Sequence, residues 1–402
     1  MTRTHAEQSA AHGKNNPPAD QLVAGYDADD GDTRDAGRRV ALVVATTTGG
    51  TGRHVASLAE GLVRAGSRVV VAGPSSTEEQ FRFTRTGARF VSVEIASGPR
   101  PVADLRAWAR LRTVLRGADL VHAHGLRAGL LAGLATPRSI PFVVTWHNAV
   151  LADGPLRTIY AQLEQVVARR ADITLCVSPD LEARVRQLGG RDVRPGPVAA
   201  PTLPPPSRSV EEVRAEFGLP PERPLVVTVA RLSPQKGLHT LIEAAAAFPT
   251  TTASGAPRAY PPLFVVAGDG PQRAELEERI TVTGAPVRLL GARNDVPDLL
   301  AAADVVTLPS QWEGSPLIAQ EALRAGRPFV GTAVGGVPSL VGDAGELVPP
   351  GDPAALAAAL ASVLDNPDHA ARLVERAAAR IPLLPTPEST IAQIRAVYAE
   401  LA

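Results

Sequence analysis

The sequence predicts an α/β protein with two doubly wound parallel sheets, and three features support this prediction. Short runs of β-branched residues alternate with longer amphipathic segments along most of the 402 residues. Glycine-rich turns follow several of these runs, and a proline-dense stretch at 195–207 (PGPVAAPTLPPPS) separates two halves that share the pattern. Because strands that alternate with helices form parallel sheets covered on both faces, we expect two Rossmann-like domains facing each other across a cleft.

The expected strands follow the β-branched runs. In the first half they are 39–45, 68–72, 89–93, 120–123, 142–145 and 173–177. In the second half they are 225–229, 263–267, 287–290, 305–308, 328–331 and 346–348. The amphipathic segments between them are expected to be the crossover helices that parallel strands require.

The same patterns divide the chain into segments. Residues 1–37 are expected to be a disordered acidic tail, because they carry seven acidic and three basic side chains and little apolar clustering. Residues 38–198 are expected to form the first domain and 223–390 the second, joined by a linker at 199–222. The end of the chain, 391–402, is expected to contain a short amphipathic helix.

Composition excludes several classes of protein. No run of about eighteen uncharged apolar residues occurs, and the first residues lack the apolar core of a secretory signal, so a spanning or exported protein is not expected. The single cysteine, Cys176, stands in the apolar run ITLCVS and is expected to be a buried thiol, without a disulfide or a cysteine metal cluster. These features predict a soluble, cytoplasmic protein.

The net charge of zero hides an asymmetry between the two halves. Residues 38–198 carry a net charge of +10, and residues 199–402 carry −6. A basic half favours an anionic partner, namely nucleic acid, a phosphorylated substrate or a membrane surface, although an arginine-rich surface without any partner explains it equally well. Aromatic residues make up only 4 % of the chain, which disfavours nucleic acid because base stacking needs them.

The first strand leads into a glycine-rich turn, TTTGGTGRH, that contains Gly50 and Gly52. Glycines there let backbone N–H groups at the start of the next helix approach an anion, although such turns are common in this architecture. A dinucleotide fingerprint does not fit, since Val55 replaces its third glycine and the second strand ends without an acidic residue for a ribose. No phosphate-binding P-loop sequence is present.

The second half carries a more specific set of charges. In VARLSPQKG, Arg231 stands at the end of a strand and Lys236 near the start of a helix, so both cations are expected at one strand end. An arginine and a lysine in this arrangement suit a diphosphate. Further along, Glu313 and Glu321 flank the turn GSPL, and a carboxylate there suits the paired hydroxyls of a ribose or hexose. The alternative for each of the cations is an exposed surface side chain.

The turn at 314–317 (GSPL) is expected to lead into a helix that begins near Pro316, a residue suited to a first helical position. The backbone N–H groups of Ser315 and Leu317 are then expected to face an anion.

Together these motifs resemble a known family. The sequence ARLSPQKG, the turn VVAGDGP at 265–271, the LLG before VPDLLAAADVVTLPS, and two glutamates separated by seven residues are similar to the retaining glycosyltransferases of family 4 (group 1), which use nucleotide sugars. The resemblance covers about 39–401. It implies the GT-B fold, a final helix that crosses back to the first domain, and catalysis without a metal or a cofactor.

The resemblance also implies roles for individual residues. It places His147, Arg231, Lys236 and Glu313 among the catalytic groups, with the His147 imidazole and carbonyl at the donor sugar. The implied donor-binding residues are Gly50, Gly52, Gly268, Gly270, Gly314, Ser315, Pro316, Leu317 and Glu321. His54 and His124 are candidates for the acceptor side, although a structural role explains them, and His122, equally well.

The implied activity is transfer of a hexose from a nucleotide diphosphate sugar, with UDP favoured over GDP, to a hydroxyl acceptor, lipid-linked or a cell-envelope glycan precursor. Two other functions stay open from the sequence: a sugar-nucleotide epimerase of similar fold, and a non-catalytic nucleotide-sugar-binding protein. A basic amphipathic helix expected at 104–117, with Leu105, Trp108, Leu111 and Leu115 on one face, either packs on the first sheet or contacts an anionic membrane at the inner face of the plasma membrane.

Overall fold

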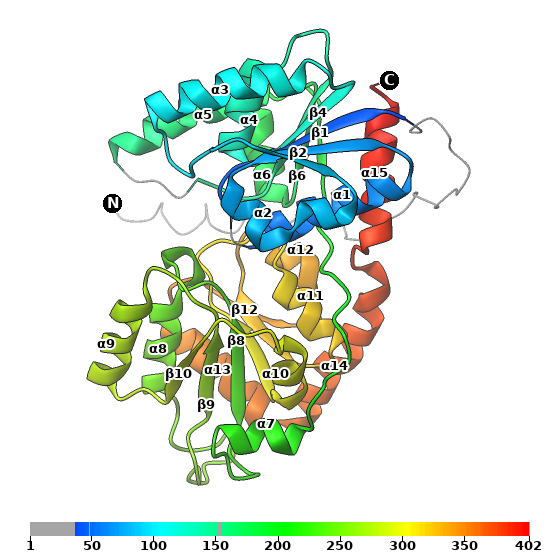
Figure 1. Cartoon of the computed structure of the whole chain (residues 1–402). Coiled ribbons are helices and arrows are strands. Elements are labelled where there is room, and N and C mark those ends of the chain that lie inside the picture. The colour runs from blue at the N-terminus through cyan, green and yellow to red at the C-terminus, as the bar shows by residue number, and fades with distance from the viewer. Residues whose placement is uncertain (1–36, 48, 151–153, 402) are drawn as a thin grey trace, which may run out of the picture.

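The computed structural model describes residues 37–47, 49–150 and 154–401, so the predicted tail at 1–37 lies almost wholly outside the described residues. These residues form two parallel sheets, one above the other in Figure 1. The first sheet has the order β3-β2-β1-β4-β5-β6-β7. Its strands are β1 (Arg39–Val44), β2 (Arg68–Gly73), β3 (Arg89–Ser92), β4 (Leu120–His124), β5 (Phe142–Trp146), β6 (Ile173–Cys176) and β7 (Val193–Pro195).

The second sheet has the order β10-β9-β8-β11-β12-β13. Its strands are β8 (Leu225–Val229), β9 (Leu263–Ala267), β10 (Val287–Gly291), β11 (Val305–Leu308), β12 (Phe329–Thr332) and β13 (Glu346–Val348). In both sheets the strand order reverses next to the first strand, between β1 and β4 and between β8 and β11. Ligands of doubly wound sheets bind in the crevice at such a reversal, beyond the carboxyl ends of the strands.

Helices cover both faces of the first sheet, because apolar side chains on β1 point alternately to its two faces. Val40, Leu42 and Val44 belong to a core cluster with α1 (Gly50–Arg64) and α15 (Pro387–Ala399), whereas Ala41 and Val43 belong to the cluster on the opposite face. The helices of that opposite face are α3 (Pro101–Leu115), α4 (Leu126–Ala135), α5 (Pro155–Arg170) and α6 (Pro179–Gln187). The short helices α2 (Ser75–Phe81) and η3 (Phe83–Thr86) lie between β2 and β3.

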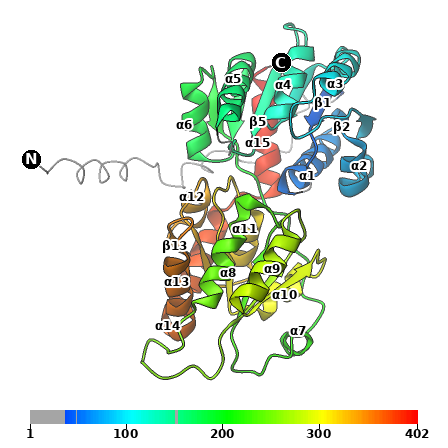
Figure 2. The ribbon, with the colours of Figure 1, turned by 90° about the vertical axis from the view of Figure 1, so that its left-hand side faces the viewer.

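The second sheet is covered in the same way. On one face lie α7 (Val210–Glu216), α10 (Val296–Ala302), α11 (Leu317–Arg324) and α12 (Val337–Val341). On the other lie α8 (Leu238–Ala246), α9 (Arg273–Thr283) and α13 (Pro353–Asp365). The remaining helices are η4 (Pro234–Lys236), α14 (Pro367–Arg380) and η5 (Ile381–Leu383). Figure 2 shows α8 and α13 on one side of the lower sheet.

Two segments connect the sheets. The expected linker at 199–222 contains helix α7, capped by Ser209, whose Val213 is fully buried in the core of the second sheet. At the other end of the chain, α15 begins at Pro387 and packs on the first sheet, where Tyr398 is fully buried. Figure 1 shows α15, in red, beside β1 and α1 in the upper half. The chain therefore passes between the two halves twice.

Three details differ from the expectations. The edge strand β7 was not expected, because its last residue, Pro195, belongs to the proline-dense stretch; a proline is tolerated at a sheet edge. Helix α3 begins at Pro101, and Leu105 is 64 % exposed instead of buried. At about 100° per residue it lies about 120° from Leu111, outside the stripe that packs on the sheet.

Cys176 is buried, as expected.

No helix in the described part of the chain combines the length and the apolar composition that crossing a bilayer demands.

Candidate active site

A partly buried ion pair lies beyond the carboxyl ends of β8 and β11. Lys236, the last residue of η4, places its Nζ 2.6 Å from Oε1 of Glu313, and the hydroxyl of Ser310 donates to the same oxygen at 2.5 Å. The Glu313 side chain is only 6 % exposed, whereas that of Lys236 is 22 % exposed and retains donors directed elsewhere. Arg231, two residues beyond β8, has an exposed side chain.

Glycines hold these loops together by close packing. Gly237 has φ +62°, and a Cβ there would stand 2.0 Å from the Pro309 carbonyl oxygen, so η4 lies directly against the loop after β11. A Cβ on Gly268 or Gly270 would stand 1.9 or 2.3 Å from a backbone oxygen of the Arg231 loop. The structure thus gives Gly268 and Gly270 a packing role that positions Arg231.

Glu321 lies on α11 and is 5 % exposed. Its Oε1 is buried and has no hydrogen-bond partner among the described residues. Burial raises the pKa of this carboxyl, against the opposing charges of Arg53, on α1 of the first domain, and Arg324. A buried carboxylate oxygen without a partner carries a desolvation cost that a ligand hydroxyl offsets by donating to it.

The turn before α11 contacts the first domain. Helix α11 begins at Leu317, so Pro316 is its N-cap rather than the expected first helical residue. Ser315 donates its hydroxyl at 3.0 Å to the carbonyl of Val198, the last residue of the expected first domain. Leu317 reaches across to Gly50, where a Cβ would lie 3.4 Å from its Cδ1.

Gly52, in contrast, is packed against the first domain's own side chains. A Cβ at Gly52 would stand 2.2 Å from the ring of Phe81, so this glycine lets α1 pack against α2. Gly50, the first residue of α1, is the glycine of this turn that lies against the second domain.

The loop that carries Glu313 is fixed to the first domain. Trp312 is 7 % exposed, packs in the first domain's core, and donates its indole N–H to Asp180 at 2.6 Å. A Cβ on Gly314 would lie 2.8 Å from the His147 carbonyl oxygen, so the two backbones are in direct contact. The His147 carbonyl, which the resemblance places at the anomeric carbon, therefore faces Gly314 in this structure.

Three buried histidines gather at the carboxyl ends of β4 and β5. His124 ends β4, His147 follows β5, and His54 comes from α1; all are less than 10 % exposed. His124 Nδ1 lies 3.1 Å from His147 Nε2, and the His54 ring stands at 5.6 and 5.3 Å from these two rings, between centroids. Burial lowers the pKa of His54 to about 4 and holds the pKa values of the other two well below the ordinary value.

His122 has a separate role. Its Nδ1 lies 2.7 Å from the Tyr398 hydroxyl on α15, and its Nε2 lies 2.7 Å from Thr145 on β5. His122, on β4, therefore joins the final helix to the first sheet through Nδ1, and its Nε2 is held by the neighbouring strand.

A cavity of about 350 Å³ adjoins the histidine cluster. His124 and His147 line it, together with hydroxyl and amide groups from the ends of the strands and from α5. Its charged lining residue, Arg127, pairs with Asp104 at 2.5 Å. The cavity is lined by Val44, Ala45, Thr46, Thr47, Thr51, Ser97, His124, Gly125, Leu126, Arg127, His147, Asn148, Ala149, Val150 and Tyr160.

The structure thus joins the expected residues into two groups. Lys236, Glu313 and Glu321 lie with Arg231 on the second domain, and His54, His124 and His147 lie on the first. Sequence reasoning did not single out Ser310, Trp312 and Arg53. No local pattern marks Ser310 or Arg53, whereas a tryptophan between two polar residues, in QWEG, was a signal for Trp312.

Comparison with known proteins decides the family. Residues 209–380 match the family described as "Glycosyl transferases group 1", and residues 49–200 match the "Glycosyl transferase 4-like domain". A 2-deoxystreptamine N-acetyl-D-glucosaminyltransferase from Streptomyces fradiae is 32 % identical over 304 residues, which are 68 % of this chain and 69 % of that protein. The chain belongs to the group 1 glycosyltransferases.

Other similar proteins agree with this assignment. The D-inositol 3-phosphate glycosyltransferase of Mycobacterium tuberculosis (strain F11) is 36 % identical over 250 residues, which span 56 % of this glycosyltransferase and 49 % of the relative. Among solved structures, Anabaena HepE in complex with UDP and glucose superposes with a TM-score of 0.75 at 21 % identity, over 90 % of this chain and all of that one. The predicted family, GT-B fold and glycosyltransferase class are confirmed.

Proposed function

We propose that this glycosyltransferase transfers a hexose from a nucleotide diphosphate sugar, with UDP favoured over GDP, to a hydroxyl acceptor with retention of configuration. The observation that carries the proposal is the charged group at the carboxyl ends of the second sheet. There Lys236 pairs with Glu313, Arg231 stands exposed in the loop that also carries Lys236, and Glu321 keeps a buried oxygen without a partner among the described residues. HepE, which shares the fold, binds UDP and glucose, and this supports UDP as the nucleotide.

The two cations have a chemical task in this proposal. As the bond between the anomeric carbon and the diphosphate oxygen stretches, negative charge accumulates on the departing diphosphate. Arg231 and Lys236 stabilise that charge more in the transition state than in the ground state, which is what accelerates a reaction. The transfer then needs no metal and no cofactor, because these side chains supply the positive charge that a metal supplies elsewhere.

The two glutamates bind hydroxyl groups. Glu321 accepts from the ribose hydroxyls, since its unpartnered oxygen is buried on α11. Glu313 faces the donor sugar, and Lys236 and Ser310 hold it in one orientation. His147 contacts the sugar from the first domain. The cavity beside it binds the acceptor hydroxyl, and His54 and His124 lie next to His147.

A nucleotide-release assay over UDP-, GDP- and ADP-sugars tests the proposal. Wild-type enzyme is expected to release UDP fastest, and proton NMR of the product is expected to show the anomeric configuration of the donor. An inverted product contradicts the retaining mechanism, and release of GDP or ADP alone contradicts the nucleotide. A donor that is isomerised without nucleotide release supports the epimerase alternative.

We also propose that the outer helices of the first domain contact an anionic membrane surface. Five large apolar side chains are exposed there: Val102 and Leu105 on α3, Leu134 on α4, and Ile159 and Val166 on α5. Basic side chains surround them, and anionic lipid attracts such surfaces while apolar groups insert. The basic residues of α3 and its end are Arg106, Arg110, Arg112 and Arg116.

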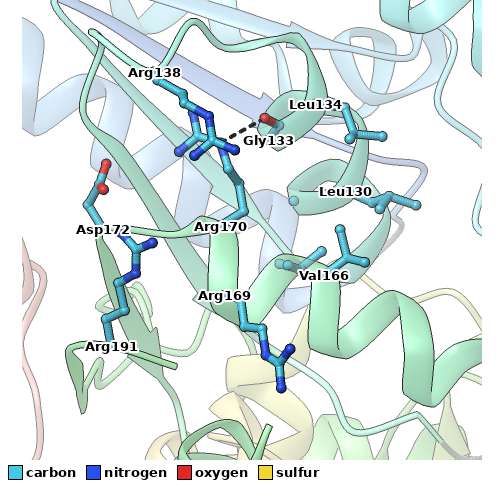
Figure 3. A pocket seen from close by; sticks show the side chains of 11 residues that line it. Leu130, Gly133, Leu134, Arg138, Val166, Arg169, Arg170, Asp172 and Arg191 are labelled. Carbon is cyan, nitrogen blue, oxygen red and sulfur yellow. Dashed lines mark hydrogen bonds between the residues drawn. The ribbon is translucent and has the colours of Figure 1, made fainter. Parts of the chain in front are cut away.

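A basic pocket lies on the same helices. Figure 3 shows Arg138 and Arg170 side by side, Arg191 reaching toward Asp172, and Leu130, Leu134 and Val166 along the opposite rim. The pocket has a volume of about 370 Å³. Burial lowers the pKa of Arg170, and the charges of Arg138 and Arg191 lower it further against the opposing charge of Asp172. This combination suits a phospholipid head group with its acyl chain against the apolar rim, and it brings the active site toward a lipid-linked acceptor.

Co-sedimentation with vesicles tests the membrane proposal. Binding is expected to require anionic lipid, to weaken with salt, and to fall when Arg106, Arg110, Arg112 and Arg116 become Gln. A matched control replaces four exposed or half-buried arginines of the second domain, Arg273, Arg279, Arg372 and Arg376, with Gln, since it changes the net charge equally. Wild-type protein that stays in the supernatant with anionic vesicles at low salt contradicts the proposal.

A further inference from the structure

We propose that His54, His124 and His147 bind a transition-metal dication of the Zn²⁺ or Co²⁺ class. Each residue offers one ring nitrogen, and these three atoms lie within 4.8 Å of one another. All three side chains are more than nine-tenths buried.

The spacing of the nitrogens is close to that of a tetrahedral site. Zinc–nitrogen bonds are about 2.0–2.1 Å, which places two ligand nitrogens about 3.3 Å apart. His124 Nδ1 and His147 Nε2 are already 3.1 Å apart. His54, which comes from a different element, completes the set with a side-chain shift on the order of 1–2 Å.

One unsatisfied atom supports a ligand here. His54 Nε2 is buried and has no hydrogen-bond partner among the described residues, whereas His124 directs its Nδ1, not its unpartnered Nε2, toward His147. Buried polar atoms without partners are uncommon, and an ion that the structure does not contain is one explanation for them. His122, whose two ring nitrogens are both hydrogen-bonded, is excluded from the site on the same ground.

The surroundings suit three neutral ligands and one open position. Three histidines with a fourth position held by water form a known catalytic type of zinc site. Here the cavity of about 350 Å³, which His124 and His147 line, provides space for that fourth ligand. The charge of Arg127, on the same cavity, is compensated by its pairing with Asp104, so it does not strongly oppose a cation.

Occupancy of this site is expected to inhibit transfer, an expectation that rests on the proposed function. The ion takes the His147 imidazole away from the donor sugar. It also places two positive charges beside an anomeric carbon that becomes positive in the transition state. The metal is therefore an inhibitor of this enzyme and takes no part in the transfer itself.

Absorption spectroscopy with Co²⁺ tests binding without any sugar nucleotide. The test uses a full-length background variant in which the histidines outside the cluster other than His122, namely His5, His12, His239 and His369, are replaced by Gln. We expect one equivalent of Co²⁺ to bind with the intense visible bands of tetrahedral geometry. His54→Gln in this background is expected to weaken binding about a hundredfold or more, because it removes a ligand.

Two further variants keep the test decisive. His147→Gln is expected to act as His54→Gln does, while His122→Gln, if its thermal unfolding shows a folded protein, is expected to bind Co²⁺ normally. Binding that is absent in the background protein, or that survives both His54→Gln and His147→Gln, overturns the site. Should all of the variants unfold, a background protein whose Tm does not rise with Zn²⁺ overturns it equally.

A separate assay tests inhibition. Zn²⁺ is expected to slow UDP release by wild-type enzyme, EDTA to restore it, and His54→Gln to need at least about tenfold more Zn²⁺ for half-inhibition of its own metal-free rate. Co²⁺ binding without inhibition overturns the inhibitory role and leaves the site. An enzyme that never releases UDP contradicts the proposed function and leaves the spectroscopic result intact.

Discussion

The two domain faces that meet at the candidate active site differ in their electrostatics. The second domain presents charges, with the Lys236–Glu313 pair at 2.6 Å and the buried carboxyl of Glu321. The first domain presents imidazoles held neutral by burial and a cavity lined mainly by hydroxyl, amide and apolar groups. Because both faces stand on sheets of nearly the same topology, the difference comes from the loops after the strands and not from the fold.

This difference indicates which domain face binds which substrate. A nucleotide diphosphate is highly charged, so the face with fixed charges suits it. A hydroxyl acceptor is neutral at the reacting oxygen, so a neutral face suits the acceptor. The comparison makes predictions that differ for the two faces.

The largest effect is expected from the cations. Arg231→Ala and Lys236→Ala should each lower kcat/KM by at least about a hundredfold, or about 2.7 kcal/mol, because both stabilise the departing diphosphate. Steady-state kinetics with the preferred donor measures this loss. Unchanged turnover in either variant contradicts the assignment.

Stability separates the two cations and supplies a control. Arg231 is exposed, so its removal should leave the unfolding free energy nearly unchanged. Lys236→Ala leaves the buried Glu313 without its counter-charge, which costs about 3 kcal/mol. The double variant Lys236→Ala with Glu313→Gln should recover that stability without recovering turnover, and urea unfolding checks it.

The glutamates should differ in what they bind. Glu321→Ala is expected to weaken the binding of free UDP by about tenfold or more, because it removes the hydrogen-bond acceptor for the ribose hydroxyls. Glu313→Ala is expected to leave the affinity for free UDP unchanged and to weaken the binding of the intact sugar nucleotide. Calorimetric titrations with both ligands measure the two affinities. Equal losses for free UDP in both variants contradict this division of roles.

A smaller effect concerns the dependence of stability on pH. Burial raises the pKa of Glu321, so the folded state binds this proton more tightly than the unfolded chain does. The contribution of Glu321 to stability is therefore largest below the pKa of an unfolded glutamate and is lost as the pH rises through the folded pKa. Glu321→Gln should gain stability relative to wild type across that range, and urea unfolding at several pH values measures the difference.

Much of the fold was predictable from the sequence, because buried parallel strands are apolar runs that local composition marks. The ranges of β8, β9, β11 and β13 agree with the expectation residue for residue. Strand β7 was missed because its last residue, Pro195, is atypical of a strand. Leu105 was assigned to the packed face of α3 because the spacing of apolar residues does not show where the buried stripe ends.

The site was predictable only where its residues form local motifs. Arg231 and Lys236 stand five positions apart in one loop, so a motif reveals them. The histidine cluster was not predictable, because His54, His124 and His147 come from three segments that only the strand order brings together. The insertion of Trp312 into the first domain depends on the relative placement of the domains, which local sequence does not encode.

The smallest effect is expected from metal removal. The side chains of the second domain supply the positive charge for the diphosphate, so transfer should continue in EDTA without added divalent ions. The rate should stay equal, or rise slightly if trace Zn²⁺ occupies the histidine cluster. Complete loss of activity that Mg²⁺ or Mn²⁺ restores contradicts this view of the charged face.

The most direct test of the difference between the faces is calorimetric titration of free UDP into a matched pair of variants, one from each face. Arg231→Ala, on the second domain, is expected to raise the dissociation constant by about tenfold or more, whereas His54→Gln, on the first domain, is expected to change it by less than about twofold. A dissociation constant that His54→Gln raises and Arg231→Ala leaves unchanged contradicts the assignment of the nucleotide to the charged face.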